Sequence, residues 1–337
     1  MSNSTYLITG ITGYIGRMMA EKLFTDAAIR QEKINVIGIV RNKQQAKGLF
    51  SVENDLKVTY IEADILDLEL CLSTLKKCGI KPDYIIHCAA PTQSVYMISN
   101  PVETAECIVI GTRNVLEMAK YYEISSMVYL SSMEVYGQID CSDGRRVCED
   151  ELGNIDLFNV RSSYPLGKRM AENLCYSYYK EYNVPVKIAR LAQTFGKGVS
   201  KDDTRVFAQF AKAVMEEKDI VLHTLGDSMG NYCDIDDAIS AIMLILEKGK
   251  LGEAYNIVNE SNTMTIREMA ELVTNTIAQG QIKVIYDIPN ENQYGYAAKT
   301  GLRLSSEKLR QLGWKSEKNM EDMYKEMIHS MKEQDLA

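Results

Sequence analysis

Short runs of β-branched residues alternate with longer amphipathic segments through the first half of the chain. The short runs predict strands at residues 6–9, 35–40, 58–61, 84–87, 127–131 and 186–191. The amphipathic segments predict helices at residues 15–28, 67–78, 101–122 and 164–183. Parallel strands need crossovers of about this length, and right-handed crossovers place helices on both faces of a sheet. The pattern therefore predicts an α/β fold built on a doubly wound parallel sheet.

The second half of the chain shows a looser version of the same alternation. It predicts helices at residues 204–217, 236–248, 265–278 and 320–332, and short strands at 220–222 and 283–286. Because single hydrophobic cores stop growing at roughly 250 to 300 residues, a chain of 337 residues is expected to form two lobes. We predict a larger domain over residues 1–190 and a smaller α/β lobe over residues 191–337. The polar stretch 138–162 lacks periodicity, and a loop of that length is usually functional.

Charge and composition narrow the classes of partner. Lys and Arg number 38 against 46 Asp and Glu, a net charge of −8, which argues against nucleic acid and anionic membranes as partners. The first residues contain no basic segment ahead of an apolar one, and no apolar run approaches the roughly 20 residues of a membrane span. We expect a cytoplasmic protein. The eight cysteines form no Cys-x-x-Cys pair and there are only three histidines, so we expect reduced thiols and no metal site.

A glycine-rich turn follows the first predicted strand. Glycine permits a tight turn and a close approach of backbone to a pyrophosphate, and the N-terminus of the next helix supplies N–H groups for the phosphates. The spacing is Gly-x-x-Gly-x-x-Gly, but its place between the first strand and the first helix of an alternating chain predicts a Rossmann-type dinucleotide site. The residues expected to bind the cofactor here are Gly10, Thr12, Gly13, Tyr14, Ile15 and Gly16.

Two further positions bear on the cofactor. The second strand is followed by Arg41, and no carboxylate stands where one would bind the adenosine ribose. An arginine there suits a 2′-phosphate, which favours NADP over NAD. The simpler alternative is that Arg41 is a solvated residue at the end of a strand with no role in binding. Asp64, after the third strand, either reaches the adenine amino group or caps the helix that begins near Asp67.

A phenol and an ammonium group lie four residues apart in a predicted helix. Tyr164 and Lys168 therefore share one face of that helix. A nearby ammonium stabilises a phenolate and lowers the phenol pKa, so Tyr164 can act as a base toward a sugar hydroxyl. The strand at 127–131 leads into Ser132 at the carboxyl edge of the sheet, where open α/β sheets bind their ligands.

The glycine turn, the serine after a strand and the Tyr-x-x-x-Lys pair occur in the order that a hydride-transfer site requires. At this point the sequence resembles the extended short-chain dehydrogenase/reductase family, specifically its nucleotide-sugar epimerase, dehydratase and decarboxylase branch. The stretch 164–175 looks most like the UDP-glucuronate decarboxylases. The motifs that carry the resemblance lie at residues 10–16, 64–65, 87–91, 111–114, 131–137, 164–172, 190–196 and 312–314.

The resemblance implies roles for the central residues. By resemblance Tyr164 takes the proton of the sugar 4-hydroxyl while C4 gives hydride to the nicotinamide. Lys168 lowers the pKa of Tyr164 and holds the nicotinamide ribose, and Ser132 hydrogen-bonds the reacting hydroxyl. The family motifs also place Ile65, Ala89 and Ala90 at the cofactor, and the loop Ala90-Pro91-Thr92, similar to the decarboxylase loop, places Thr92 at the substrate.

The fate of the 4-keto sugar depends on two neighbouring positions. Glu134 stands where dehydratases and UDP-glucuronate decarboxylases carry a glutamate, which can abstract the acidified C5 proton; a carboxylate bonded to loop backbone is the simpler alternative. Met133 stands where dTDP-glucose 4,6-dehydratases keep an aspartic acid that protonates the leaving hydroxyl. A thioether cannot donate that proton, so dehydration of the dTDP-glucose type is disfavoured.

Two positions depart from the family pattern in the second lobe. Gln193 replaces the usual Asn that contacts sugar or phosphates, and Gly230 replaces the usual Arg that binds the nucleotide diphosphate. Losing that Arg removes a charge-assisted phosphate contact. Either Arg205 or Arg303 substitutes for it, or the substrate tail differs from UDP or dTDP. Asn231, beside Gly230, is also expected at the substrate.

We therefore expect an NAD(P)-dependent enzyme that oxidises C4 of a nucleotide sugar, epimerises or decarboxylates the product and returns the hydride. Dehydration ranks below these two outcomes. The alternatives are an NADPH-dependent reductase of keto-sugars or other carbonyls, and a non-catalytic redox sensor or scaffold. The resemblance also implies a homodimer formed by the helices at 101–122 and 164–183, to which Met118, Tyr121, Tyr122, Tyr176, Tyr178 and Tyr179 contribute apolar surface.

Overall fold

The chain forms two compact units. The computed structural model describes residues 4–48, 58–289 and 300–334. The first unit comprises Met1–Gly137, Asn154–Arg190 and Ile239–Tyr255, and the second comprises Gln138–Gly153, Leu191–Ala238 and Asn256–Ala337. The chain passes between the units at residue 190, where we place the domain boundary, and also at both ends of the segments 138–153 and 239–255.

A seven-stranded sheet with the strand order β11-β6-β5-β4-β1-β2-β3 forms the centre of the first unit. Its strands are β1 (Ser4–Thr9), β2 (Ile34–Val40), β3 (Val58–Glu62), β4 (Tyr84–His87), β5 (Ser126–Ser132), β6 (Val186–Leu191) and β11 (Ala254–Ile257). β1 pairs in parallel with both β2 and β4. The six strands predicted in the first half, and the doubly wound sheet, are confirmed. β11 was not predicted, because it comes from the second half of the chain.

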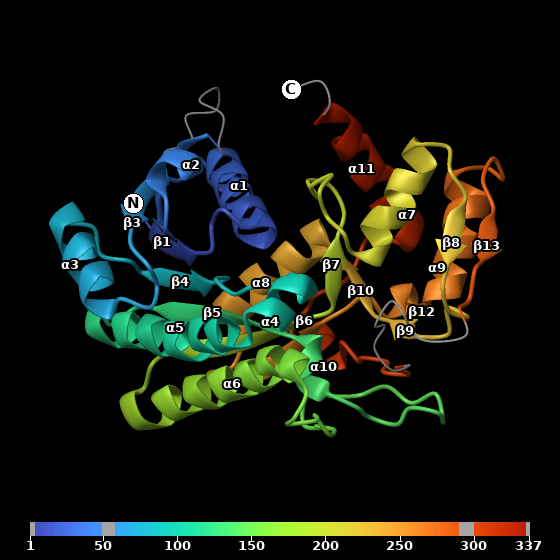
Figure 1. Cartoon of the computed structure of the whole chain (residues 1–337). Helices are drawn as coiled ribbons and strands as arrows, with labels where there is room; N and C mark the ends of the chain where they lie inside the picture. Colours follow the sequence, from blue (N-terminus) through green and yellow to red (C-terminus); the bar gives the residue numbers. More distant parts are fainter. Residues whose placement is uncertain (1–3, 49–57, 290–299, 335–337) are drawn as a thin grey trace. The chain divides into compact units, whose positions relative to one another are not determined.

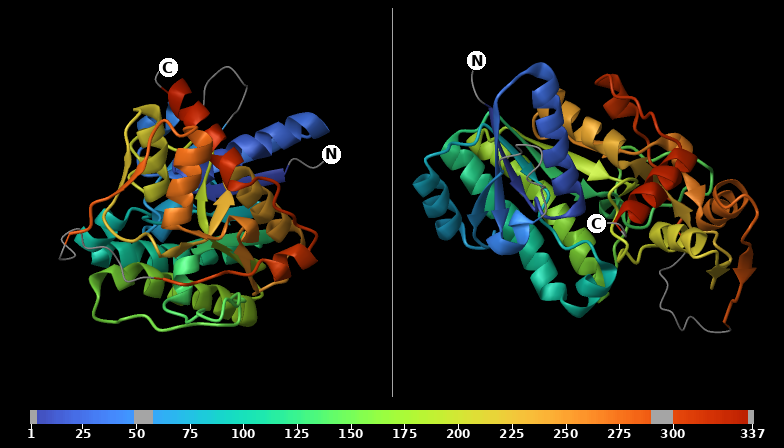
Figure 2. Two further views of the ribbon diagram at one scale, coloured as in Figure 1. Left: turned by 90° about the vertical axis from the view of Figure 1, so that its right-hand side faces the viewer. Right: turned by 90° about the horizontal axis from the view of Figure 1, so that it is seen from above.

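The helices of the first unit lie between these strands in sequence. They are α1 (Tyr14–Arg30), α2 (Lys43–Lys47), α3 (Leu68–Cys78), α4 (Ser94–Ser99), α5 (Pro101–Tyr122) and α6 (Ser163–Tyr182), with the 3-10 turns η2 (Met133–Tyr136) and η3 (Val160–Ser162). The four predicted helices are confirmed, and α2 and α4 are additional. α5 and α6 run side by side on one face of the sheet, and α1 lies on the opposite face (Figures 1 and 2).

The core between the sheet and α3, α5 and α6 explains why the alternating pattern folds in this way. Apolar side chains from both layers are fully or almost fully buried there; they include Leu7, Ile37, Ile85, Met127, Leu75, Ile108, Val115 and Cys175. Strands buried on both faces read as continuous apolar runs, whereas the helices bury only one stripe. This difference produced the two patterns visible in the sequence.

Small sheets and helices build the second unit. Its strands are β7 (Gln193–Phe195), β8 (Ile220–Leu222), β9 (Met229–Gly230), β10 (Tyr232–Asp234), β12 (Met264–Thr265) and β13 (Val284–Tyr286), which pair as β7 with β10, β8 with β13 and β9 with β12. Its helices are α7 (Val206–Met215), α9 (Ile266–Leu272), α10 (Glu307–Gln311) and α11 (Met320–Glu333), with the turns η4 (Glu260–Asn262) and η5 (Val273–Ile277). α8 (Ile235–Lys248) begins in this unit and continues into the first. The predicted strands at 220–222 and 283–286 are confirmed.

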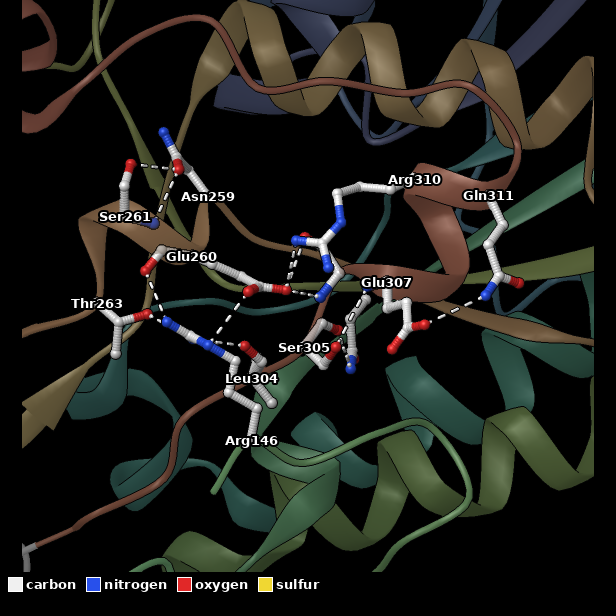
Figure 3. Close-up of polar contacts among 12 residues, drawn as sticks. Arg146, Asn259, Glu260, Ser261, Thr263, Leu304, Ser305, Glu307, Arg310 and Gln311 are labelled. Atoms are coloured by element: carbon white, nitrogen blue, oxygen red, sulfur yellow. Dashed lines mark hydrogen bonds and ion pairs between the residues drawn. The ribbon is translucent and has the colours of Figure 1, made fainter. Parts of the chain in front are cut away.

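An ion-pair network joins distant segments of the second unit (Figure 3). Glu260 binds Arg146 Nε at 3.1 Å and Arg310 Nη1 at 2.9 Å. Arg146 also donates to the carbonyl of Leu304 at 2.9 Å. Beside it, the backbone N–H of Val147 donates to the carbonyl of Arg303 at 2.7 Å. The network therefore attaches the segment 138–153, part of the stretch expected to be a functional loop, to the backbone on both sides of Leu304.

A buried polar chain ties together four elements of the first unit. Ser131 at the end of β5 donates to Glu172 of α6 at 2.6 Å. Arg190 of β6 binds the same carboxylate through Nε at 3.0 Å and Nη2 at 2.7 Å, and its Nη1 donates to the hydroxyl of Tyr136 at 3.0 Å. Glu172 and Arg190 are both buried. Each neutralises the charge of the other, because burial of either charge without a partner would cost free energy.

We predict that Glu172→Leu destabilises the first unit by about 3–5 kcal/mol, because it leaves the buried Arg190 guanidinium without its carboxylate. The double variant Glu172→Leu/Arg190→Met removes both charges and is expected to recover most of the lost melting temperature. Thermal unfolding followed by circular dichroism checks both variants. A double variant that melts no higher than Glu172→Leu contradicts this explanation.

A candidate dinucleotide and Ser-Tyr-Lys site

The glycine turn lies at the point where the strand order of the sheet reverses. β1 has β2 on one side and β4 on the other, and open α/β sheets bind ligands outside the carboxyl ends of the strands at such a point. Gly10 has φ +67°, and a Cβ there would lie 2.8 Å from the backbone nitrogen of Ala89, which follows β4. A Cβ at Gly16 would overlap the Gly10 carbonyl oxygen. Both glycines are therefore required by close backbone contacts.

The beginning of α1 has the properties of an anion site. Gly13 is the N-cap and makes no side-chain cap hydrogen bond, and the first turn contains no acidic residue. Thr12 and Gly13 are exposed, whereas Tyr14 and Ile15 are half-buried. The positive end of the helix dipole and the first-turn N–H groups suit a pyrophosphate. These residues fit the diphosphate of a dinucleotide.

The end of β2 carries both an exposed Arg41 and, from the neighbouring strand, a carboxylate. Val40 of β2 pairs with Glu62 of β3, and Glu62 accepts a hydrogen bond from the Lys43 backbone at 3.3 Å. The sequence predicted no carboxylate at the position after β2 where one would bind the adenosine ribose, and that prediction rested only on the residues that follow β2. The carboxylate comes from a strand adjacent in space.

The residues after β3 hold one another in place. Asp64 accepts a hydrogen bond from the backbone N–H of Leu66 at 2.9 Å, and Asp67, not Asp64, caps α3. The capping interpretation of Asp64 is therefore wrong. Ile65 is buried, and its carbonyl accepts a hydrogen bond from the Asn114 side chain at 2.9 Å. Asp64 as a whole residue is exposed.

The chain after β4 is anchored to β1. Ala89 donates its backbone N–H to Thr9 Oγ1 at 3.3 Å, and Ala89 and Ala90 are half-buried, whereas Thr92 is exposed. His87 at the end of β4 is buried between Thr9 and Thr112, 2.6 Å and 3.1 Å from their hydroxyls. Burial, with a smaller contribution from the Lys168 charge, lowers the pKa of His87 to about 3. His87 is thus a neutral structural link.

Ser132, Tyr164 and Lys168 converge at the carboxyl end of β5. Ser132 accepts a hydrogen bond from the Glu134 backbone at 3.2 Å and also hydrogen-bonds the phenol of Tyr164. Lys168 Nζ lies 5.8 Å from the centre of the Tyr164 ring and donates to the carbonyl of Leu130 at 2.7 Å. Tyr164 and Lys168 are 7% and 4% exposed. The sequence placed the two on one helical face, and the fold adds Ser132.

The pKa of Tyr164 differs from the expectation. Burial, followed by the negative charge of Glu134, raises the pKa of Tyr164 well above its ordinary value, while the Ser132 hydrogen bond and the Arg161 charge oppose the rise. Burial lowers the pKa of Lys168 to about 8, so its ammonium group loses its proton at a lower pH than that of an exposed lysine. The expected lowering of the Tyr164 pKa is therefore wrong for the chain by itself.

Glu134 is held by an arginine that the sequence reasoning missed. Arg161 Nη2 donates to Glu134 Oε1 at 2.8 Å, and the guanidinium carbon lies 5.5 Å from the centre of the Tyr164 ring. The two residues are 27 positions apart, on η2 and η3. The only sequence signal was the position of Arg161 three residues before Tyr164, within an aperiodic polar stretch.

The expected substrate residues Gln193, Arg205, Asn231 and Arg303 lie in the second unit. Arg205 caps α7 and pairs with Asp203 through Nε at 3.0 Å. Asn231 is fully buried and its side chain binds the Leu302 carbonyl and the Leu304 N–H, so it clamps the backbone on both sides of Arg303. Arg303 is half-buried. Gln193 Oε1 is buried and makes no hydrogen bond within the part of the chain that the structure describes.

The ring of Tyr232 explains the glycine at position 230. A Cβ on Gly230 would overlap the hydroxyl and ring carbons of Tyr232. Tyr232 is fully buried, stacks edge-on against Phe195 at 5.9 Å and pairs with Gln193 across β10 and β7. Because the phenol ring occupies this space, position 230 has no room for the arginine that the resemblance led us to look for.

Within the described ranges, every helix is too short or too polar to cross a membrane. A search of the same residues finds no cluster of His, Cys, Asp and Glu suited to a metal ion.

Comparison with known proteins agrees with this geometry. The model of the NAD dependent epimerase/dehydratase family matches residues 6–258. The chain is 30% identical over 254 residues to dTDP-D-glucose 4,6-dehydratase of Dictyostelium discoideum, covering 74% of this chain and 57% of that protein. It is 29% identical over 292 residues to UDP-glucuronic acid decarboxylase 6 of Arabidopsis thaliana, covering 86% and 79%. The structure of UDP-glucose 4-epimerase from Thermotoga maritima superposes with a TM-score of 0.79 at 20% identity, covering 98% and 99%.

The doubly wound sheet, the glycine turn and the Ser-Tyr-Lys arrangement define an extended short-chain dehydrogenase/reductase, as the sequence motifs indicated. The chain belongs to the NAD dependent epimerase/dehydratase family. It spans little more than half the length of the Dictyostelium relative.

We predict that Gly230→Ala lowers the stability of the second unit by about 1–3 kcal/mol, because its methyl group must displace the Tyr232 ring. Gly301→Ala is the matched control, since a Cβ at Gly301 meets no atom of the described residues within 4 Å. Differential scanning calorimetry is expected to show a lower melting temperature for Gly230→Ala alone. Equal melting temperatures for the two variants would refute the steric explanation.

Proposed function

We propose that this protein oxidises C4 of a nucleotide-activated sugar and returns the hydride after epimerisation or decarboxylation of the 4-keto sugar. The observation that carries the proposal is the meeting of Ser132, Tyr164 and Lys168 at the sheet edge that also carries the glycine turn. When bound, the nicotinamide accepts the hydride of C4 and later gives it back. The names of the relatives, a dehydratase and decarboxylases, support the same class of substrate.

The three side chains have separate tasks in this proposal. Tyr164 removes the proton of the 4-hydroxyl as C4 loses its hydride, so that a carbonyl forms at C4. Ser132 hydrogen-bonds both Tyr164 and the reacting oxygen. Lys168 places its positive charge below the phenol and holds the nicotinamide ribose. Because the pKa of Tyr164 is raised in the chain by itself, ionisation of the phenol requires positive charge from a bound ligand in addition to Lys168.

The residues beside Tyr164 favour some fates of the 4-keto sugar over others. Met133 has no proton to give to a leaving hydroxyl, which disfavours dehydration of the dTDP-glucose type. Glu134 is paired with Arg161, so one of its two carboxylate oxygens already accepts a hydrogen bond. Epimerisation needs only a turn of the sugar, and decarboxylation needs only the electron-withdrawing carbonyl at C4. We place these two outcomes ahead of dehydration.

The residues that we propose as substrate ligands belong to both units of the chain. Thr92 belongs to the first unit, and Gln193, Arg205 and Arg303 are the candidates of the second. Of the two arginines, Arg205 already pairs with Asp203, whereas the backbone around Arg303 is clamped by Asn231 and Val147. We therefore favour Arg303 as the phosphate ligand that replaces the arginine missing at position 230.

The assembly proposed from the resemblance is a homodimer through α5 and α6. Tyr121 and Tyr176 are about half exposed on these helices, and Ile110 and Met170 add exposed apolar surface. Of the other expected contributors, Met118 and Tyr178 are buried in the core of the first unit, and Tyr122 and Tyr179 pack against it. The apolar surface available for a dimer is therefore smaller than the sequence suggested.

The second candidate function is net reduction of a carbonyl compound with exchangeable NADPH. Exposed Arg41 favours it, because a guanidinium at the end of β2 can bind a 2′-phosphate. Glu62 beside the same turn favours the ribose hydroxyls of NAD instead. We keep NADP as the slightly preferred cofactor on the strength of Arg41.

We predict that Tyr164→Phe lowers kcat by about 10²–10⁴-fold, because it removes the base that takes the hydroxyl proton. The assay incubates the protein with UDP-, CDP-, GDP- and dTDP-sugars and identifies the products by loss of CO₂, by loss of water, or by altered stereochemistry at unchanged mass. Tyr176→Phe, on the exposed face of the same helix, is the control. Full activity in Tyr164→Phe would reject the assigned role.

Arg41→Gln is expected to weaken NADPH binding about 10–100-fold and to leave NADH binding almost unchanged, because only NADPH has a 2′-phosphate. Cofactor fluorescence titration measures both affinities. Arg30→Gln removes another exposed arginine of the same unit and serves as the control. Equal effects on the two cofactors would remove the argument for NADP.

A further inference from the structure

The two terminal nitrogens of the Arg161 guanidinium differ in their hydrogen bonding. Its Nη2 donates to Glu134 at 2.8 Å. Its Nη1 is buried, yet among the described residues it has no hydrogen-bond partner. Buried guanidinium N–H groups are normally paired, because leaving one unpaired costs free energy. The unpaired Nη1 therefore marks a place where an acceptor outside the chain is expected to bind.

The position of this donor indicates which part of the substrate it meets. The guanidinium carbon lies 5.5 Å from the centre of the Tyr164 ring, and both Glu134 and Arg161 act on the charge of the phenol. In the proposed function Tyr164 contacts the oxygen on C4. The groups beside C4 are those on C3 and C5, whereas the diphosphate is attached at C1, across the sugar ring. Arg161 is thus placed for a substituent on C3 or C5 and not for a phosphate; of these two positions, only C5 of a hexose carries a carbon substituent that can be a carboxylate.

The chemistry of the donor selects among C5 substituents. A guanidinium binds a carboxylate through charge-assisted hydrogen bonds, which are about twice as strong as those to a neutral hydroxyl. A C5 carboxylate would supply the charged acceptor that Nη1 lacks. A hydroxymethyl group would offer only a neutral oxygen, and a methyl group would offer none.

We infer that Arg161 determines substrate specificity by binding the C5 carboxylate of a nucleotide-activated hexuronic acid. The inference rests on the proposed oxidation at C4, since that reaction places C5 beside Tyr164. Glu134 acts as a positioning residue in this arrangement: it fixes Nη2 so that Nη1 faces the sugar. Arg161 then lies between two carboxylates, one from the protein and one from the substrate.

Equilibrium binding to the full chain tests the inference without requiring turnover. Calorimetry compares two matched pairs of probes, UDP-glucuronic acid with UDP-glucose and GDP-mannuronic acid with GDP-mannose. In at least one pair the uronic acid is expected to bind about 10–100-fold more tightly than the neutral sugar. Arg161→Gln is expected to reduce this ratio to about two or less and to leave binding of the neutral sugar within about threefold. Arg161→Lys keeps the charge and should retain part of the preference.

The Glu134→Gln variant distinguishes two possible roles of Arg161. In one role Arg161 binds the substrate carboxylate, and in the other it only holds Glu134 in place. If Arg161 binds the carboxylate, Glu134→Gln keeps the preference for the uronic acid. If Arg161 only holds Glu134, the two Gln variants behave alike, and the inference is overturned. Arg30→Gln is the control for loss of an exposed arginine, and melting temperatures establish that each variant is folded.

The binding result and the hydride-transfer result are read separately. Turnover is followed by the mass and the stereochemistry of the sugar product, so an unaltered sugar for every nucleotide sugar would reject the proposed function. Preference for the neutral sugar in both probe pairs, or an equal loss for both sugars in Arg161→Gln, would reject the role of Arg161 even when hydride transfer occurs.

Discussion

The geometry of the candidate site depends on the buried pair of Glu172 and Arg190. Glu172 lies on α6, one turn beyond Lys168, and Arg190 lies on β6. Through Ser131 and Tyr136 the pair also reaches the end of β5 and the turn η2. Ser132 and Glu134 belong to these last two elements, and Tyr164 and Lys168 belong to α6. One charge pair therefore sets the positions of four candidate site residues, and its burial makes each partner costly to lose.

The pKa values of the residues near the site are determined by burial more than by the net charge of the chain. The chain carries a net charge of −8, yet the residues around the N-terminal end of α6 include Lys168 and Arg161. Burial lowers the pKa of Lys168 to about 8 and raises the pKa of Tyr164. The phenol is therefore neutral in the chain by itself. In the proposed function, positive charge from a bound ligand would add to that of Lys168 and favour ionisation of this phenol.

In the second unit, the choice of residue at position 230 depends on the side chain at position 232. Gly230 is necessary because the Tyr232 ring fills the adjoining space, and Asn231 between them is occupied in clamping the segment around Arg303. Arg146 and Glu260 hold the same segment from the other side.

Sequence periodicity alone determined the doubly wound sheet, most helix bounds, the glycine turn and the pairing of Tyr164 with Lys168 on one helical face. These features depend on local repeats of two or 3.6 residues and on the backbone freedom of glycine, which any stretch of sequence displays by itself. The tertiary structure decided the contacts between segments distant in sequence. It brought Glu62 to the end of β2, Arg161 to Glu134 and the Tyr232 ring to Gly230. It also decided the pKa of Tyr164, because burial is a property of the folded chain and has no local signature in the sequence.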